Sequence, residues 1–328
     1  MRTNRFLLVC ALSGLLAFGV AACGGDDETA DGGTASAAET SGEELSGEIR
    51  IDGSSTVFPF MEAAGELFNE EQPDVRITVG QSGTGGGFEK FCAGETDISN
   101  ASRPIKEDEE APVCEKNGVE YGEAQIANDG IAVVTNKGLE VDCLTTEQLK
   151  QLWAPGSKAQ SLADIDPSLP DTPLSLYGPG TDSGTFDYFT DEINGEEGAS
   201  REDYEASEDD NQLVTGVSGD EGGLGYFGFS YYEANADNLN LVAIDAGDGC
   251  VPPSTESIQD GSYKPLGRPL FMYPSAKALR RPEVQAFVEF VEANHQTIAE
   301  AAGYVPMTEQ QAAEAKKAVD QAEQEAGA

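Results

Sequence analysis

The chain has 328 residues, with 60 acidic and 19 basic side chains, one histidine and a formal charge of −41 at pH 7. Non-specific binding to nucleic acid or to acidic lipid is not expected of so acidic a chain, because those partners are themselves negatively charged. The length is sufficient for two lobes, and two lobes allow a ligand cleft between them.

The first segment, residues 1–22, has the pattern of a secretory signal, with two arginines before an apolar run. Residues 20–23, Val-Ala-Ala-Cys, resemble a bacterial lipobox and predict that Cys23 is lipidated; a plain signal peptide cleaved nearby is the alternative. Residues 23–46 are mainly small, hydroxylic or acidic and predict a lipidated, disordered tether. No later segment approaches the ~20 apolar residues of a membrane span. We therefore expect an exported protein held by lipid at the outer face of the cell membrane, in a periplasm or on the cell surface.

The cysteines indicate disulfides. Cys10 is removed with the signal and Cys23 is assigned to lipid, which leaves an even set: Cys92, Cys114, Cys143 and Cys250. In an exported protein this set predicts two disulfides, with three pairings open. We favour Cys92–Cys114 and Cys143–Cys250, because the first closes a local loop and the second a long loop within one lobe. No metal site is predicted, since no Cys-x-x-Cys spacing occurs and the sole histidine, His295, is far away in the sequence.

Three stretches share the order strand, Gly/Ser/Thr loop and helix. The predicted strands are 47–52, 75–79 and 174–177, and the loops that follow them are 53–59, 80–88 and 178–185. At such a junction, unpaired N–H groups and the positive end of a helix dipole can face an anion. In the third loop, Ser183 and Thr185 add hydroxyl donors, while Gly184 lets a ligand approach the backbone. We predict a converging oxyanion site; capped helices and flexible turns without a ligand are the alternative.

One arginine stands at the end of a further predicted strand, 97–105. Pro104 restricts Arg103 to an extended conformation, and the small residues before it leave room for a ligand. A guanidinium in this position can form a two-pronged pair with an oxyanion. The alternative is a surface arginine that pairs with one of the many acids.

The rest of the chain alternates between strand and helix patterns. Apolar alternation predicts strands at 121–134, 239–244 and 268–273, the last of which returns to the first lobe. Helical periodicity predicts helices at 144–153 and from Pro282 to near Gly303. The tail after Met307 has helical propensity, and no role is assigned to it.

Five short motifs occur in the order found in PstS-type phosphate-binding proteins, the substrate-binding components of the high-affinity phosphate ABC transporter. They are residues 53–59, 82–88, 97–105, 183–185 and 223–226. The chain resembles this family over most of residues 47–306. The resemblance implies an α/β, two-lobe periplasmic-binding-protein fold, in which two mixed sheets flanked by helices are joined by two crossover strands and the ligand lies in the inter-lobe cleft. We expect lobe I to comprise 47–127 and 265–328, and lobe II to comprise 128–264.

The resemblance also implies which residues grip dehydrated phosphate. Lobe I would supply Ser55, Thr56, the Val57 N–H, Ser82 or Thr84, and Arg103; lobe II would supply Ser183, the Gly184 N–H and Thr185. The best-known branch of the family has an aspartate where Arg103 stands and an arginine near Pro179, so the two charges look exchanged between the lobes. Asp182 is then expected to face Arg103 across the ligand and to accept the proton that phosphate carries and sulfate lacks. The alternative is that Asp182 only caps the following helix.

These features predict a non-enzymatic, monomeric binding protein without a cofactor. It would capture inorganic phosphate and deliver it to the membrane permease of an ABC transporter. A binding protein for another oxyanion, such as molybdate, sulfate or arsenate, is the alternative. A hydrolase that uses Asp182 or Ser183 is disfavoured, because an aspartic protease needs a second Asp-Ser/Thr-Gly sequence and a serine hydrolase needs a histidine base. The glycine-rich loop lacks the Gly-Lys-Ser/Thr of a P-loop.

Overall fold

The structure is a computed structural model that describes residues 44–181 and 183–327, with side chains to Gln324. The predicted signal, the tether and the lipidation at Cys23 therefore lie outside the described residues, and so does Asp182. In the part that is described, no helix combines the length and apolar character needed to cross a membrane.

Lobe I is built on three parallel strands in the order β2-β1-β3. These are β1 (Gly47–Gly53), β2 (Val75–Gln81) and β3 (Ile98–Ala101), and they alternate along the chain with α1 (Phe58–Glu71), α2 (Gly83–Cys92) and α3 (Ala111–Asn117). Since the strands are parallel, the loops at their carboxyl ends all leave from one edge of the sheet. Those loops include both predicted hydroxyl loops of lobe I and Arg103.

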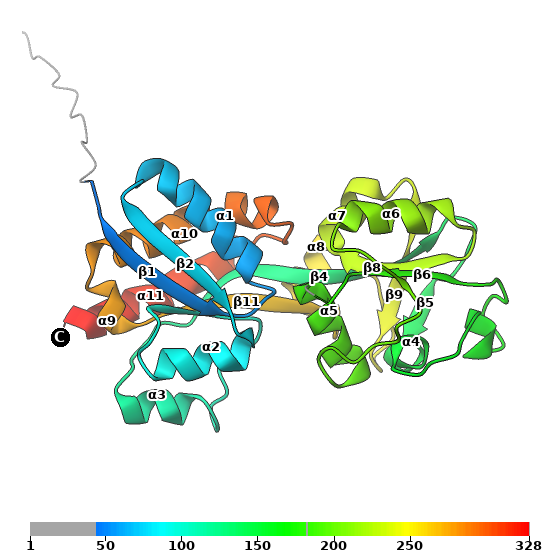
Figure 1. Ribbon diagram of the computed structural model, residues 1–328, viewed down its shortest axis with the longest axis horizontal. Helices are drawn as coiled ribbons and strands as arrows, with labels where there is room; N and C mark the ends of the chain where they lie inside the picture. Colours follow the sequence, from blue (N-terminus) through cyan, green and yellow to red (C-terminus); the bar gives the residue numbers. More distant parts are fainter. Residues whose placement is uncertain (1–43, 182, 328) are drawn as a thin grey trace, which may run out of the picture. The chain divides into compact units, whose positions relative to one another are not determined.

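Two long strands, β4 (Ala124–Asn136) and β11 (Gly267–Pro274), run between the lobes (Figure 1). The strand β11 pairs antiparallel with β3 on one side and with the first part of β4 on the other. The second part of β4 pairs with β8 and β9 of lobe II. The two predicted sheets thus share β4, which joins them into one continuous ladder.

Lobe II contains the remaining short strands and the helices around them. Its strands are β5 (Cys143–Thr145), β6 (Ser175–Gly178), β7 (Glu205–Ala206), β8 (Gly223–Gly228), β9 (Leu239–Asp245) and β10 (Cys250–Val251). Its helices are α4 (Thr146–Trp153), α5 (Gly184–Phe189), α6 (Asp210–Gly219), α7 (Phe229–Asn235) and α8 (Thr255–Gln259), with a 3-10 turn at Leu162–Asp164 and a π-turn at Thr190–Asn194. Its core is centred on Tyr226, whose ring stacks on Phe189 at 3.8 Å between centroids and meets Trp153 edge-on at 4.9 Å.

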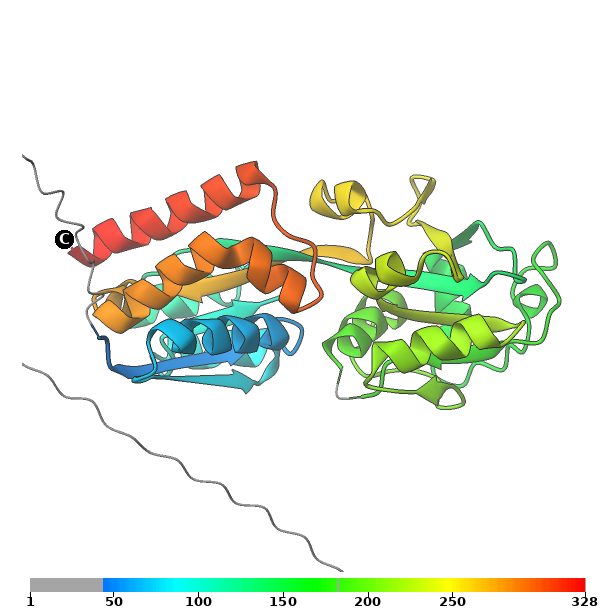
Figure 2. The same cartoon turned by 90° about the horizontal axis from the view of Figure 1, so that it is seen from above.

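The C-terminal segment returns to lobe I as α9 (Ala276–Leu279), α10 (Pro282–Ala301) and α11 (Glu309–Gly327). Figure 2 shows α10 and α11 beside each other against the lobe I sheet. The apolar face of α10 packs on α1, where the rings of Phe68 and Phe287 lie 5.4 Å apart. The tail helix buries Ala315, Val319 and Ala322 in the same core. The tail therefore covers lobe I, a role that its sequence did not suggest.

Both favoured disulfides are formed in the structure. Cys92 at the end of α2 is bonded to Cys114 in α3. Cys143 in β5 is bonded to Cys250 in β10, and these two strands flank β9. Each bond therefore closes a loop within one lobe, as the spacing favoured.

The second glycine-rich stretch differs from its prediction. The sequence predicts a loop through residue 88, whereas α2 already begins at Gly83. The reason is tertiary packing: a Cβ on Gly87 would lie 2.5 Å from the Gly53 Cα, so glycine allows the helix to lie directly on β1. This close packing outweighs the low helix propensity of glycine.

Candidate functional site

The carboxyl ends of the lobe I strands bring the predicted hydroxyl residues together. The loop after β1 is tied to β3 because the Ser54 N–H donates to the Asn100 carbonyl at 3.1 Å. The side chains of Thr84 and Ser102 hydrogen-bond to each other at 3.1 Å, which connects the start of α2 to the end of β3. The hydroxyls of the three loops therefore lie at one edge of the sheet, as parallel strands require.

The first loop of lobe I touches the first turn of α5 in lobe II. The Thr56 hydroxyl donates to the Gly184 carbonyl at 3.1 Å, and the Ser55 hydroxyl donates to the Asp187 carboxylate at 2.9 Å. A Cβ on Gly184 would lie 2.6 Å from the Thr56 Cα and N. We expected Gly184 to admit a ligand; in the structure it admits the backbone of the opposite loop.

This contact separates two cavities along the cleft. One, of about 310 Å³, is lined by Ser55, Thr56, Ser82, Thr84 and Arg103 of the predicted site, together with Arg268. We call it the arginine cavity. The other, of about 600 Å³, is lined by Ser55, Thr56, Ser183, Gly184 and Thr185 of the predicted site, together with Glu62, Asp129, Glu208 and Asp210. We call it the acidic cavity. Ser55 and Thr56 line both, so the predicted residues of the two lobes meet at this pair.

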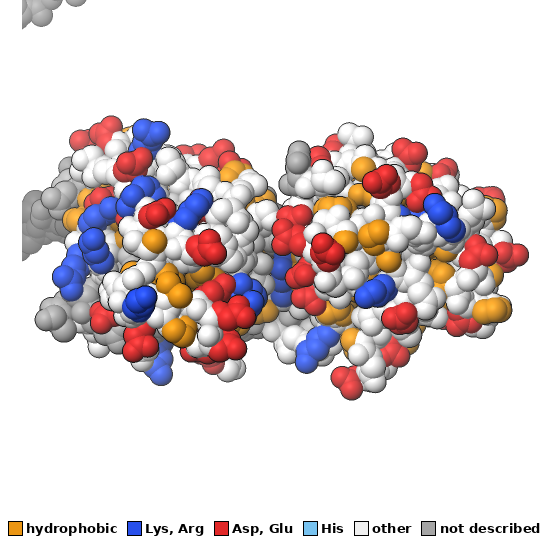
Figure 3. Space-filling view, turned by 60° about the horizontal axis from the view of Figure 1, so that its bottom comes forward, with side chains coloured by type: hydrophobic (Ala, Val, Ile, Leu, Met, Phe, Trp, Pro, Cys, Tyr) orange, Lys and Arg blue, Asp and Glu red, His pale blue; other side chains and the backbone are white. Residues whose placement is uncertain are grey.

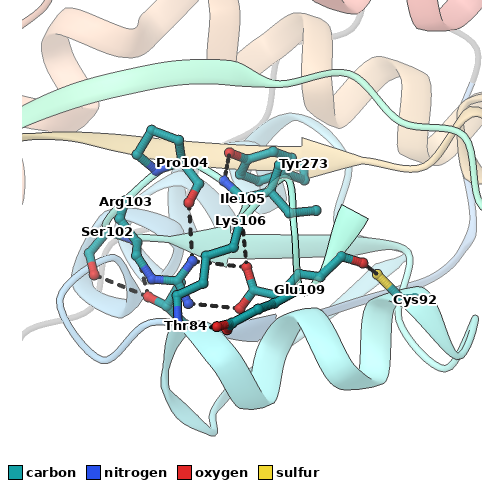
Figure 4. A network of polar contacts seen from close by, with 10 residues as sticks. Thr84, Cys92, Ser102, Arg103, Pro104, Ile105, Lys106, Glu109 and Tyr273 are labelled. Atoms are coloured by element: carbon teal, nitrogen blue, oxygen red, sulfur yellow. Dashed lines mark hydrogen bonds and ion pairs between the residues drawn. The ribbon is translucent and has the colours of Figure 1, made fainter. Parts of the chain in front are cut away.

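Arg103 lines the arginine cavity, but its guanidinium is held by Glu110. Nη1 donates to Glu110 Oε2 at 2.9 Å and Nη2 donates to Glu110 Oε1 at 2.7 Å. Figure 4 shows this network, which also contains Thr84 and Ser102. The hydrogen bonds to Glu110 raise the pKa of Arg103. Burial tends to raise the pKa of Glu110, but its hydrogen bonds with Arg103 and with the Lys106 N–H outweigh burial and lower it. The two-pronged pair predicted for an oxyanion is thus made with a carboxylate of the chain itself.

Two further predicted donors of lobe I also have partners within the protein. The Ser82 hydroxyl donates to Asp52, whose other oxygen accepts from Lys90 Nζ at 2.7 Å. Burial tends to raise the pKa of Asp52, yet these hydrogen bonds lower it. The Val57 N–H donates to the Ser54 carbonyl at 3.1 Å as the chain turns into α1. The hydroxyl pair Ser55–Thr56 is therefore the part of this set that reaches the opposite lobe.

In lobe II, Ser183 is the N-cap of α5. Its side-chain oxygen accepts a hydrogen bond from the Thr185 N–H at 3.2 Å. The residue before it, Asp182, lies outside the described residues, so its predicted contact with the ligand stays a prediction. The alternative, that Asp182 only caps the helix, is likewise left untested.

The sequence did not single out Arg268, which projects from β11 into the arginine cavity. Its Nη2 donates to the Thr56 hydroxyl at 2.6 Å, and its Cζ lies 3.3 Å from the centroid of the Tyr188 ring. In the strand register, Arg268 stands opposite Asp129 of β4, and its Nε lies 3.6 Å from the Asp129 carboxylate. One signal was available: like Arg103, Arg268 directly precedes a proline.

Acidic side chains also surround the cleft, among them Asp187, which the sequence did not single out. Figure 3 shows acidic groups on both sides of the groove between the lobes. Burial raises the pKa of Asp187, against the opposing effects of the Ser55 hydrogen bond and of Arg268. Burial and the nearby carboxylates of Asp209, Glu208 and Asp129 raise the pKa of Asp210 to about 7. The sequence signal that could have indicated Asp187 is its place as an acid in the first turn of the predicted helix, which is α5 in the structure.

His295 takes no part in the cleft. It lies half-buried on α10 and lines a separate cavity of about 240 Å³ beneath α11. Among residues 44–181 and 183–327, no group of three or more His, Cys, Asp or Glu side chains is arranged to hold a metal ion.

Comparison with known proteins identifies the family. Residues 34–294 match the PBP superfamily domain. The chain is 45% identical to the protein SphX of Synechococcus elongatus over 262 residues, covering 79% of this chain and 77% of that protein. It is 40% identical over 277 residues to the phosphate-binding protein PstS of Staphylococcus saprophyticus, covering 84% and 85% of the two chains.

A crystal structure described as a possible phosphate binding protein, from Planctomyces limnophilus, superimposes with a TM-score of 0.81 at 41% identity and covers 85% of this chain and 99% of its own. This similarity confirms the predicted two-lobe α/β fold. The chain therefore belongs to the PBP superfamily and, within it, to the family of PstS-type phosphate-binding proteins.

Proposed function

We propose that this protein captures inorganic phosphate between its two lobes and delivers it to the membrane permease of an ABC transporter. The observation that carries the proposal is the meeting of Ser55 and Thr56 with the first turn of α5, beside a cavity that holds two arginines. Hydroxyl donors from one lobe, a helix N-terminus from the other and guanidinium groups form a suitable set for a dehydrated oxyanion. The names of the relatives agree with phosphate as the ligand.

In the proposed complex, phosphate lies at the arginine-cavity side of the Ser55–Thr56 pair. Lobe I offers Ser55, Thr56, Val57, Ser82, Thr84 and Arg103, and lobe II offers Asp182, Ser183, Gly184 and Thr185. We propose that the lobes comprise 47–127 with 265–328, and 128–264. The two crossover strands then act as the hinge about which the lobes close.

The proposal includes the location and the partners. Residues 1–22 are a signal peptide, and a lipid on Cys23 holds the mature protein at the outer face of the membrane through the tether 23–46. The protein acts as a monomer and as a carrier, and it performs no catalysis. The sequence features that support this are the lipobox-like segment and the absence of a histidine base near Ser183.

Phosphate is favoured over sulfate and molybdate, which carry no proton at neutral pH; arsenate keeps a proton as phosphate does and is not distinguished by this feature. A carboxylate in the site accepts a hydrogen bond from the proton that phosphate retains at neutral pH, while sulfate brings only unpaired repulsion. Asp182 is proposed for this role. Replacement Asp182→Asn should therefore reduce discrimination against sulfate, and unchanged affinities for both anions would remove Asp182 from the site.

Isothermal titration calorimetry of the mature protein with phosphate and with sulfate is the direct test. We expect stoichiometric binding of phosphate and at least about 100-fold weaker binding of sulfate. Arg103→Ala should weaken phosphate binding, and Arg76→Ala, on the exposed face of β2, is the matched control. No phosphate binding by the wild-type protein would disprove the proposal.

A further inference from the structure

The two arginines of the arginine cavity differ in how many of their donors are available. Arg103 makes two charge-assisted hydrogen bonds with Glu110 and a third with the Pro104 carbonyl at 3.1 Å. Binding of an anion by Arg103 requires some of these bonds to be exchanged. Among the described contacts of Arg268, by contrast, the one hydrogen bond is with the neutral hydroxyl of Thr56. A neutral hydroxyl is a weaker competitor for a guanidinium than a carboxylate is.

The ion pair between Arg268 and Asp129 leaves one donor and one acceptor without a hydrogen bond. The distance of 3.6 Å between Nε and Oδ2 is too long for a hydrogen bond. Both atoms are buried and have no hydrogen-bond partner among the described residues. The side chains are 14% and 5% exposed. Nε is thus directed at Asp129, while the one described hydrogen bond of the guanidinium is made by Nη2 to a neutral hydroxyl, so a guanidinium that lines the arginine cavity keeps N–H donors for an acceptor.

Contacts from three parts of the fold fix the plane of the Arg268 guanidinium. Asp129 approaches it from the neighbouring crossover strand, Thr56 from the lobe I loop, and the Tyr188 ring from α5 in lobe II. Both lobes and the hinge strands thus define its position. Thr56 is already the hydrogen-bond partner of Arg268. An anion bound to this guanidinium would therefore also contact the hydroxyl pair Ser55–Thr56.

We propose that Arg268, on the crossover strand β11, is the principal cationic ligand of the captured anion, with Asp129 holding it in place. This inference rests on the proposed function and assigns its main charge contact to the hinge rather than to the loop that carries Arg103. Anion binding then acts directly on the two strands that join the lobes. Several acids line the same cavity, among them Asp187 and Glu192. The cations of its described lining are Arg268 and Arg103.

The test is calorimetric titration of the wild-type protein, Arg268→Ala, Arg103→Ala and the control Arg76→Ala with inorganic phosphate. We expect Arg268→Ala to lose about 100-fold or more in affinity, Arg103→Ala to lose about 10-fold or less, and the control to bind as the wild type does. Circular dichroism and thermal unfolding establish that each variant is folded. A folded Arg268→Ala variant within about threefold of the wild type would overturn the inference.

A second variant keeps the inference testable if Arg268→Ala does not fold. Arg268→Lys keeps the charge and loses the planar fork, so we expect a loss of about 10-fold in phosphate affinity. Affinity within about twofold of the wild type would overturn the inference.

The positioning role of Asp129 is tested with Asp129→Asn, for which small-angle scattering should show less compaction on adding phosphate. Unchanged compaction would remove that role. Absence of phosphate binding by the wild-type protein would be a different result, which disproves the proposed function itself.

Discussion

The arginine cavity and the acidic cavity share Ser55 and Thr56 but differ in charge. Four carboxylates line each cavity, but among the described lining residues the arginine cavity also has two cations, Arg103 and Arg268, whereas the acidic cavity has no lysine or arginine. The predicted donors of lobe II, Ser183 and Thr185, line the acidic cavity. Because Arg103 and Arg268 line the arginine cavity, an oxyanion is nevertheless expected on that side of the hydroxyl pair, with the first turn of α5 brought against it by movement of the lobes.

Loss of the contact that divides the cavities is expected to weaken phosphate binding strongly. In Gly184→Ala the new methyl group would lie 2.6 Å from the Thr56 backbone, so the loops could not approach as they do. We expect a loss of about 100-fold in phosphate affinity, measured by calorimetry, with a thermal unfolding midpoint close to that of the wild type. Gly219→Ala is the matched control, because a Cβ there meets nothing within 4 Å. Wild-type affinity in Gly184→Ala would show that binding does not need this approach.

A smaller effect, on stability, is expected from the acidic cavity. The pKa of Asp210 is raised from 3.8 to about 7, chiefly by burial. Between these two pH values the folded state keeps a proton that the unfolded state has released. The contribution of this proton to the free energy of unfolding is fully present below about pH 4 and is lost as the pH rises through about 7. Asp210→Asn cannot ionise and so keeps its stability as the pH rises. The free energy of unfolding of this variant should exceed that of the wild type at pH 8 by on the order of 2 kcal/mol.

Urea unfolding between pH 4 and pH 8 measures this difference. The advantage of Asp210→Asn should be smallest at pH 4, grow up to about pH 7 and then level off. Asp248→Asn, in an exposed loop, is the matched control. An advantage of the same size at every pH would contradict the assignment of the titration to Asp210.

A modest effect is expected when Arg103 is released from its carboxylate partner. In Glu110→Gln the carboxylate that engages Arg103 becomes neutral, which makes the donors of Arg103 easier to exchange and removes one negative charge near the cavity. We expect phosphate affinity to increase about threefold in low-salt calorimetry. Weaker binding would instead show that Glu110 positions Arg103 for the ligand.

The parts of this molecule that the sequence predicted are those with local patterns. The strand, loop and helix order around residues 53–59 and 178–185 depends on neighbouring residues and was correct in the structure. The predicted second loop was longer than the loop in the structure. Its glycines are helical because Gly87 packs closely against Gly53, which the local sequence does not show. Pairing of the cysteines followed from loop size within a lobe.

The long-range contacts of the site could not be predicted in this way. An arginine directly before a proline occurs at Arg103, Arg268 and Arg281, and this local signal does not distinguish among them. In the structure, Arg103 pairs with Glu110, Arg281 pairs with Asp97 directly before β3, and Arg268 donates to Thr56. Which arginine enters the cleft depends on how β11 pairs with β4, and that pairing joins residues far apart in the chain.

Capture of phosphate can be measured by calorimetric titration of the mature wild-type protein with phosphate at pH 7.5, in the presence and absence of excess sulfate. We expect one phosphate per chain with a Kd tighter than about 1 μM, little changed by sulfate. No heat of binding with phosphate, or equal competition by sulfate, would contradict this expectation.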